Sequence, residues 1–343
     1  MGSATWCWAR SPRPWSAAAT APSSRSPTPR PRPGEPTTTG SRIRATAAAI
    51  RSMRIRGAAE IGRRAADALA SDVSRTRGAL PSLRRRAEAG ARTLLSARPT
   101  AVSLEHGVGA VLRAIAAAGD PNEARAGARR AADAFRRATL ESRDRIARGG
   151  ARLVQDGHRI LTHCHSTTVV AILRQAWAEG RRFEVWATET RPFQQGILTV
   201  RDLAGAGIPA TLVVDGAANR VLKGKPIDQV LVGADTVSRE GHLFNKIGTS
   251  GVAALAGILD IPFRAAAGFH KFTDRPAADV VVEERPANEI LGRRALPRGA
   301  RAENPVFDRT DAEDVVAYVT EDGPRPPLAA VARALEVQKG VGR

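Results

Sequence analysis

The sequence has little of what several classes of protein require. Only two of its 343 residues are cysteine, Cys7 and Cys164, and their separation gives neither a disulfide framework nor the ligand spacing of a zinc site. No apolar run approaches the roughly 20 residues needed to span a bilayer, and residues 208–214 form one of the longest. We therefore expect a cytoplasmic protein that does not enter a membrane.

Aromatic residues and lysine are also scarce. Aromatic residues make up 4% of the chain, with a single tyrosine, whereas arginine supplies most of the net charge of +19. That charge alone suggests a polyanion as partner, but no strand is rich in the aromatic side chains that stack on bases. We therefore expect no nucleic acid as the main partner and assign part of the positive charge to phosphate ligands.

Composition divides the chain into four parts. Residues 1–41 hold eight of the 22 prolines and one acid, Glu35, so we expect a disordered Pro/Arg-rich tail with no role in activity. Residues 42–150 are rich in Ala and Arg in amphipathic stretches, which predicts a helical N-terminal domain of four or five helices. Residues 151–330 are expected to form an α/β domain, and residues 331–343 a C-terminal tail.

Short apolar runs alternate with helical stretches from about residue 158. Strand and helix at this spacing predict a Rossmann-like, doubly wound parallel sheet. The expected strands are 159–162, 183–187, 210–214, 229–232, 263–267 and 279–282. The fold class is therefore α/β, with an all-helical domain preceding the parallel sheet.

Polar residues follow the first four of these strands. They are residues 163–166, 189–192, Asp215 and Asp235. In an open α/β sheet, ligands bind beyond the carboxyl ends of the strands. The convergence of polar side chains at these ends predicts a single active-site cleft.

The segment His163-Cys164-His165 allows three interpretations. A metal site lacks a nearby third ligand at standard spacing, and a lone cysteine can be buried and inert. Alternatively, Cys164 acts as an acid, base or nucleophile, with its pKa lowered by neighbouring cations or by the next helix N-terminus. Ser166 and Thr167 suit the start of that helix, where free N–H groups can hold a phosphate.

Asp235 and the segment 245–251 are further candidates. A carboxylate at a strand end suits proton transfer, although a helix cap or turn is the alternative. Residues 245–251 combine Lys246 with glycines before a helix at 252–259, and the N-terminus of that helix attracts phosphate. The segment lacks the order of a P-loop, and no GxGxxG motif is present, so nicotinamide and flavin cofactors lack support.

Two basic segments of the helical region could hold a second phosphate. One is Arg56-Gly57-Ala58-Ala59, and the other contains Arg98. Glycine beside arginine lets a ligand approach the backbone. Arginine is common throughout the chain, so this signal is weak by itself.

Taken together, these segments resemble the initiation-factor-2B-like family over about residues 42–325. The shared motifs are IRGAAEIGRRAA (55–66), RPTAVSL (98–104), THCHS (162–166), ETRP (189–192), VGAD (232–235), NKIGT (245–249), KF (271–272), ERPANEI (284–290) and NPVFD (304–308). The combination of motifs in this order is highly specific. It implies a member of a family that contains both sugar-phosphate isomerases and regulatory subunits of a translation factor.

The resemblance implies an isomerase that converts ribose 1,5-bisphosphate into ribulose 1,5-bisphosphate in nucleoside-monophosphate salvage. Cys164 followed by His165 matches the bisphosphate enzymes, whereas methylthioribose-1-phosphate isomerases typically carry Cys-Asn. Translation subunits usually lack both the cysteine and the aspartate, and here Asp235 is present as well. Isomerisation of another pentose 1-phosphate, such as methylthioribose 1-phosphate, and a non-catalytic regulatory subunit are the alternatives.

The resemblance also implies roles for individual residues. Cys164 acts as the base that takes the C2 proton, and Asp235 is the partner acid. The implied substrate-binding residues are Arg56, Gly57, Ala58, Ala59, Arg98, Ser166, Thr167, Thr168, Asn245, Lys246 and Lys271. Thr167 and Thr168 depart from the family, in which a Lys- or Gly-containing stretch is common, and so does Ala59, where glycine is frequent.

The family pattern extends to cofactors and partners. It implies no metal and no organic cofactor, a sugar bisphosphate as small-molecule ligand, and AMP as an activator. It further implies a homo-oligomer, either a dimer or a hexamer.

Overall fold

A computed structural model describes residues 40–340 of the chain. Residues 40–340 belong to one compact unit. The predicted tail, residues 1–41, lies outside the described residues except for Gly40 and Ser41, and Ser41 begins the first helix. The predicted division at residue 150 remains a prediction, although a helix ends at Ala151.

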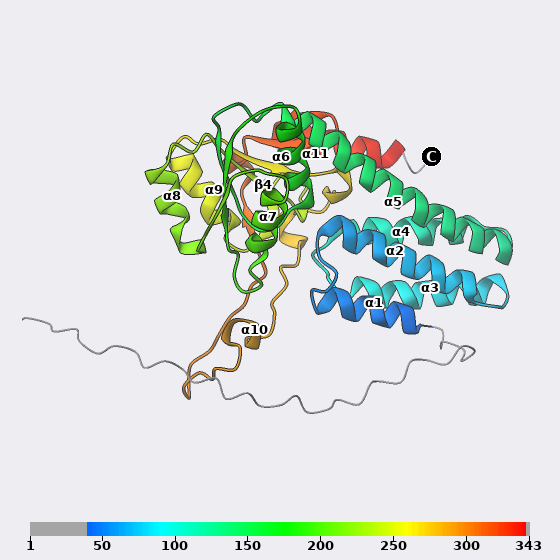
Figure 1. Ribbon diagram of the computed structural model, residues 1–343. Helices are drawn as coiled ribbons and strands as arrows, with labels where there is room; N and C mark the ends of the chain where they lie inside the picture. The colour runs from blue at the N-terminus through cyan, green and yellow to red at the C-terminus, as the bar shows by residue number, and fades with distance from the viewer. Residues whose placement is uncertain (1–39, 341–343) are drawn as a thin grey trace, which may run out of the picture. The chain divides into compact units, whose positions relative to one another are not determined.

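The N-terminal region is helical, as predicted. Its five helices are α1 (Ser41–Arg51), α2 (Ala58–Arg75), α3 (Leu80–Leu95), α4 (Val102–Ala117) and α5 (Pro121–Ala151), and Figure 1 shows α1 to α4 side by side with the long α5. Asp120 starts α5 by accepting hydrogen bonds from the amides of Asn122 and Glu123, which have no partner within the helix.

The contact between α2 and α4 depends on glycine. A Cβ atom on Gly62 would lie 2.4 Å from the carbonyl oxygen of Ser103, and one on Gly107 would lie 2.6 Å from that of Gly62. The surrounding core is made largely of alanine, for example Ala65 and Ala66, which are fully buried. Small side chains therefore bring these two helix backbones into direct contact.

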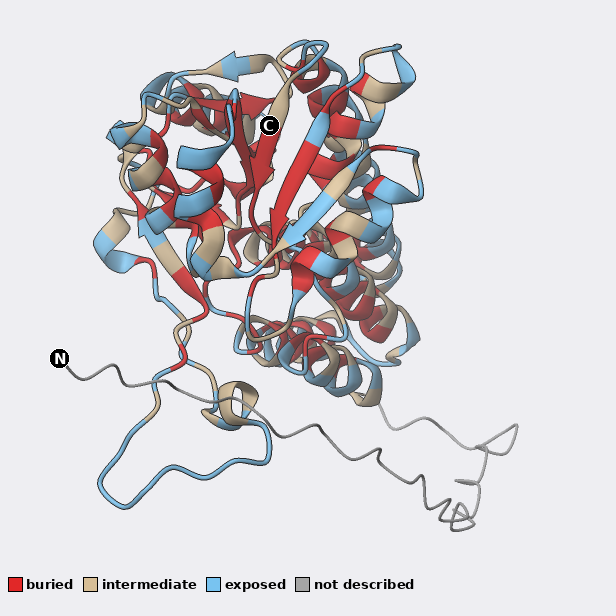
Figure 2. Ribbon diagram, turned by 60° about the vertical axis from the view of Figure 1, so that its left-hand side comes forward, coloured by how far each residue is buried: buried red, intermediate tan, exposed pale blue. Residues whose placement is uncertain are grey.

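The C-terminal region contains the predicted doubly wound sheet. Its strands lie in the order β10-β9-β7-β4-β1-β2-β3, and all neighbours are parallel except β10 and β9. The strands are β1 (Arg159–Thr162), β2 (Glu184–Thr188), β3 (Ala210–Val213), β4 (Gln229–Gly233), β7 (Phe263–Ala266), β9 (Ala317–Thr320) and β10 (Gly323–Arg325). Figure 2 shows the central strands in the buried colour.

Alternate residues of the strands pack into two hydrophobic cores, one on each face of the sheet. Leu161 and Val230 pack toward α8 (Ala218–Gly224), α9 (Thr249–Ile258) and α11 (Pro327–Gly340). Ile160 and Leu231 pack on the opposite face, toward the end of α5 and toward α6 (Thr167–Ala178) and α7 (Gln195–Ala204). Helices therefore cover both faces of the sheet, as a doubly wound fold requires.

The prediction of a strand at 279–282 was wrong. The chain there leaves a short 3-10 helix, η3 (Ala277–Asp279), and Val281 and Val282 are 61% and 38% exposed. The edge of β7 is occupied instead by β9, which the apolar pattern had not indicated. A projecting arm, residues 283–305, follows and carries the short helix α10 (Asn288–Leu291), as Figures 1 and 2 show.

Two further features differ from expectation. A small antiparallel sheet joins β5 (Thr236–Val237), β6 (Leu243–Lys246) and β8 (Phe307–Thr310). The expected C-terminal tail is helical up to residue 340, because α11 continues and buries Val331 and Ala334 against the sheet. Among residues 40–340, no helix combines the length and hydrophobicity needed to traverse a bilayer.

The close contact of α2 and α4 gives a test of the packing. Gly107→Ala should lower the free energy of unfolding by about 1–3 kcal/mol, because the added methyl group would meet the backbone of α2. Gly109→Ala on the same helix is the matched control, since its methyl group meets only the flexible end of Arg113. Urea denaturation should show the control unchanged or slightly stabilised; equal losses in both variants would contradict this account.

Candidate active site

Strands β1 and β4 are neighbours at the point where the strand order reverses. Chain connections run from β1 outward to β2 and β3 on one side, and from β4 to β7 and β9 on the other. Ligands bind at such a switch point in doubly wound sheets. Cys164 follows β1 and Asp235 follows β4, so the predicted catalytic pair lies at this position.

A cavity of about 240 Å³ opens at these strand ends. It is smaller than the ~300–1,000 Å³ typical of pockets for drug-sized ligands. The predicted site residues that line it are Arg56, Gly57, Ala58, Ala59, Cys164, Ser166, Thr167, Thr168, Asp235, Asn245 and Lys271. The structure therefore brings segments 56–59 and 164–168 to one wall, although more than 100 residues separate them in the chain.

Arg98 and Lys246 do not reach the cavity wall. Both are buried, with 5% and 3% exposure, and both pack against the ring of Phe307, at 4.9 Å for the guanidinium and 4.7 Å for the ammonium group. Arg98 Nε has no hydrogen-bond partner and lies 3.9 Å from Glu283 Oε2. These two cations act on the cavity through their charge.

Two helix N-termini face the cavity. Residues 56–59 lead into α2, and Gly57, with φ of 80°, precedes its first residue without a side-chain cap. Ser166, Thr167 and Thr168 form the start of α6, where the Ser166 hydroxyl accepts a hydrogen bond from the amide of Val169. The helix dipole makes both ends favourable for an anion, and the start of α2 also has no side-chain cap.

The third predicted phosphate site, at the start of α9, is closed. The Asp308 carboxylate accepts hydrogen bonds from the amides of Gly248 and Ser250, at 2.7 and 3.1 Å, and from the Ser250 hydroxyl. A carboxylate already occupies the place where we had expected phosphate. Asn245 lines the cavity, but its side chain also bonds to Thr249 inside this turn.

The pKa of Cys164 is raised, contrary to our expectation that neighbouring cations lower it. Burial raises the pKa of the thiol to about 11, which outweighs the opposite effects of Lys246 and Arg98. The nearby Asp235 carboxylate raises the pKa further. The thiol therefore carries its proton at neutral pH.

The two histidines beside Cys164 make hydrogen bonds within the fold. His163 is buried and bonds to Thr188 Oγ1 at 2.6 Å and to the carbonyl oxygen of Ile247 at 2.8 Å. His165 Nδ1 lies 3.1 Å from Thr199 Oγ1. Burial lowers the pKa of both rings, and no group of three His, Cys, Asp or Glu between residues 40 and 340 is arranged to hold a metal ion.

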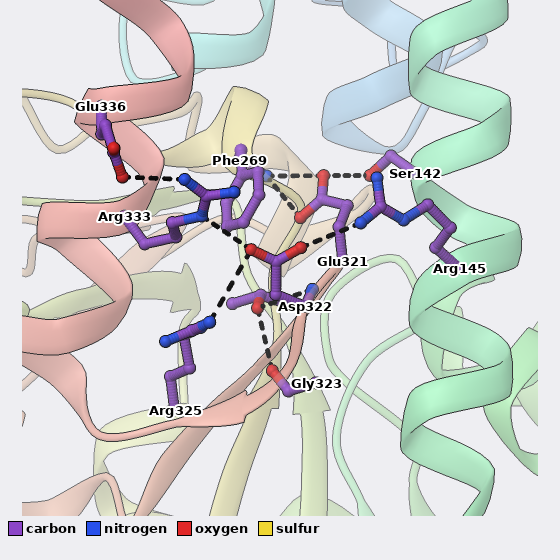
Figure 3. Close-up of polar contacts among 10 residues, drawn as sticks. Ser142, Arg145, Phe269, Glu321, Asp322, Gly323, Arg325, Arg333 and Glu336 are labelled. Carbon is purple, nitrogen blue, oxygen red and sulfur yellow. Dashed lines mark hydrogen bonds and ion pairs between the residues drawn. The ribbon is translucent and has the colours of Figure 1, made fainter.

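Lys271 reaches the cavity from a short 3-10 helix, η2 (Phe269–Lys271). Behind it, Glu321 accepts hydrogen bonds from Ser142 of α5 at 2.5 Å and from the Phe269 amide at 2.9 Å, as Figure 3 shows. Burial lowers the pKa of Lys271, whereas Asp235 and Glu321 raise it. Glu321 therefore fixes η2 from behind and supplies a counter-charge to its lysine.

Sequence reasoning missed two charged residues of the cavity, Glu60 and Arg63. They form an ion pair at 2.6 Å on the first two turns of α2. Arg63 lies four residues after Ala59, so helical spacing could have placed it on the same face. Asp308 was also missed, although it ends the NPVFD motif.

A doubly wound sheet whose switch point opens onto a small, positively charged cavity is the architecture of an α/β protein that binds a small anion. The sequence profile of the initiation factor 2 subunit family matches residues 54–327. The chain belongs to this family, which confirms the resemblance seen in its motifs.

Relatives in this family carry enzymatic names. A ribose 1,5-bisphosphate isomerase from Archaeoglobus fulgidus is 38% identical over 82% of this chain and 88% of that protein. A methylthioribose-1-phosphate isomerase from Chloroflexus aurantiacus is 41% identical over 85% of this chain and 89% of that protein. The solved translation initiation factor eIF-2B of Pyrococcus horikoshii superposes with a TM-score of 0.74 at 26% identity, covering 85% of this chain and 99% of that one.

The raised thiol pKa can be measured by alkylation. In a Cys7→Ser background, which leaves one thiol, the iodoacetamide rate should rise with pH toward a midpoint of about 11. Asp235→Asn should move this midpoint downward, because it removes a nearby carboxylate that raises the thiol pKa. Asp274→Asn, which removes an exposed carboxylate, is the control; a midpoint below 8 in the parent protein would contradict the burial argument.

Proposed function

We propose that this protein is a sugar-phosphate isomerase that converts ribose 1,5-bisphosphate into ribulose 1,5-bisphosphate. The observation that carries the proposal is the position of Cys164 and Asp235 at neighbouring strand ends of one cavity. A thiol and a carboxylate facing one small ligand suit proton transfer between adjacent carbons. Relatives with this name, at 38% identity over most of the chain, support the assignment.

The charge of the cavity supports a substrate with two phosphates. The starts of α2 and α6 are two separate anion-binding positions. Lys271 lines the same space, and Lys246 and Arg98 lie behind it. We assign one phosphate to residues 56–59 with Arg63, and the other to residues 166–168 with Lys271.

The reaction requires four proton movements that balance. The C2 proton leaves while the bond from C1 to the ring oxygen breaks and that oxygen gains a proton, which gives an enol phosphate. The O2 proton then leaves and C1 gains a proton, which gives the ketone. One group must begin protonated and the other deprotonated, and each returns to its starting state after the second step. Cys164 and Asp235 therefore share one proton in the active enzyme.

The raised pKa of Cys164 favours the proton on sulfur at the start. In this arrangement the Asp235 carboxylate takes the C2 proton and the thiol protonates the ring oxygen, the reverse of the roles implied by the resemblance. The two arrangements differ only in which member of the pair carries the single proton. They therefore have the same overall charge and the same pH dependence.

The resemblance extends the proposal beyond the reaction. It implies nucleoside-monophosphate salvage, AMP as an activator and an assembly of two or more copies, while the scarcity of cysteine indicates a cytoplasmic location. Isomerisation of methylthioribose 1-phosphate is the second candidate, because a relative with that name is 41% identical.

Turnover assays separate the candidates. Purified protein should convert ribose 1,5-bisphosphate to the ketose, followed by NMR in deuterated water, and should be much slower with ribose 1-phosphate and methylthioribose 1-phosphate. Cys164→Ser and Asp235→Asn should each lower kcat by at least about 10²-fold, because each removes a positioned proton carrier. Absence of turnover of the bisphosphate would refute the proposal, and near-native kcat in either variant would remove that residue from the mechanism.

The proton shared by Cys164 and Asp235 determines how kcat/KM should change at alkaline pH. The value of kcat/KM should stay level through mildly alkaline pH and then fall. Burial lowers the pKa of Lys271, so its phosphate-binding charge is lost first, and at about pH 11 the thiol loses the proton that the pair must carry. Circular dichroism at each pH excludes unfolding as the cause. A steady rise in kcat/KM between pH 7 and 10 would instead mean that the doubly deprotonated pair is active.

A further inference from the structure

The backbone of Cys164 is held in a conformation that cysteine rarely adopts. Its φ is 69°, in the left-handed region that favours glycine. Such backbone conformations persist where the surrounding structure imposes them, and they cluster at functional sites. At Cys164, hydrogen bonds to the backbone impose it.

Two threonine hydroxyls hold the two polar backbone groups of Cys164. Its amide donates to Thr190 Oγ1 at 2.9 Å, and its carbonyl oxygen accepts from Thr199 Oγ1 at 2.8 Å. Both threonines are buried. Thr190 lies just after β2, and Thr199 lies in α7. These two residues, called the threonine clamp below, therefore both come from the segment that follows the neighbouring strand.

Hydrogen bonds also fix Thr190 of the clamp to the end of the next strand, β3. The Thr190 hydroxyl donates to the Thr188 carbonyl oxygen at 3.2 Å, which leaves its lone pair for the Cys164 amide. The amides of Thr190 and Arg191 both donate to the Asp215 carboxylate at 2.7 Å. Asp215 follows β3, so hydrogen bonds link the ends of β1, β2 and β3 in sheet order.

We propose that Thr190 and Thr199 are positioning residues that hold Cys164 in its left-handed conformation and so direct its thiol into the cavity beside Asp235. The inference rests on the proposed function, because it assigns Cys164 a chemical role. Neither threonine lines the cavity. The effect of Thr190 on the reaction is therefore exerted through Cys164, whereas Thr199 also bonds to His165 of the cavity wall. A misplaced reacting group costs rate more than binding.

The test replaces each hydroxyl by a methyl group of similar size. Thr190→Val and Thr199→Val should lower kcat about 10- to 100-fold with little change in KM, whereas Thr199→Ser, which keeps the hydroxyl, should retain most of kcat. Thr320→Val is the matched control, because the buried Thr320 hydroxyl also donates to a backbone carbonyl oxygen, that of Gly323. Thr320 lies in β9, which β7 and β4 separate from β1. Wild-type kcat in both valine variants would overturn the proposal, as would an equal loss in Thr320→Val.

A second measurement needs no substrate. In the Cys7→Ser background, iodoacetamide alkylation of Cys164 across pH should show a shifted thiol midpoint in Thr190→Val and Thr199→Val, because the sulfur moves relative to Lys246 and Asp235. The midpoint in Thr320→Val should match the parent protein. An unshifted midpoint in both clamp variants would overturn the proposal. If the parent does not isomerise the bisphosphate but the midpoints shift, the proposed function fails and the positioning role stands.

Discussion

Strands β1 and β4 pair through Ile160 with Gln229 and Leu161 with Val230, and the rest of the site depends on this pairing. It joins two strands that are separated in the chain by β2, β3, three α-helices and a short 3-10 helix. Because parallel strands end on the same edge, the pairing brings the residues after β1 and β4 together. A shift of register by one residue would turn each strand's side chains to the opposite face.

Positively charged groups gather around the cavity that the sheet positions. Two helix N-termini and Lys271 meet at the cavity, while Arg98 and Lys246 are buried behind it with few carboxylates to balance them. Burying cations costs free energy, which an anionic ligand would offset. Asp308 closes the start of α9, so the positive potential is concentrated at the starts of α2 and α6.

Much of this was predictable from the sequence, and the failures have physical reasons. Five of the expected strands lie within a residue of their places, because buried parallel strands form continuous apolar runs. The strand at 279–282 failed because an apolar run alone does not supply a neighbouring strand. Most residues predicted from motifs line the cavity. The motifs could not show that Asp308 caps α9 or that burial outweighs the cations at Cys164. Those outcomes depend on distances between segments far apart in the chain.

The hydrogen bonds at the strand ends explain why the site tolerates an unfavourable backbone conformation. Glycine at position 164 would relieve the strain but remove the thiol, so the chain retains cysteine and secures it with Thr190 and Thr199. His163, one residue earlier, ties β1 to the turn before α9 through Ile247. The Cys164 backbone and the His163 ring are thus satisfied by β2, by the segment that follows it and by the turn before α9. The orientation of the Cys164 side chain therefore depends on hydrogen bonds along the whole edge of the sheet. The cavity forms only when these separate loops are folded together.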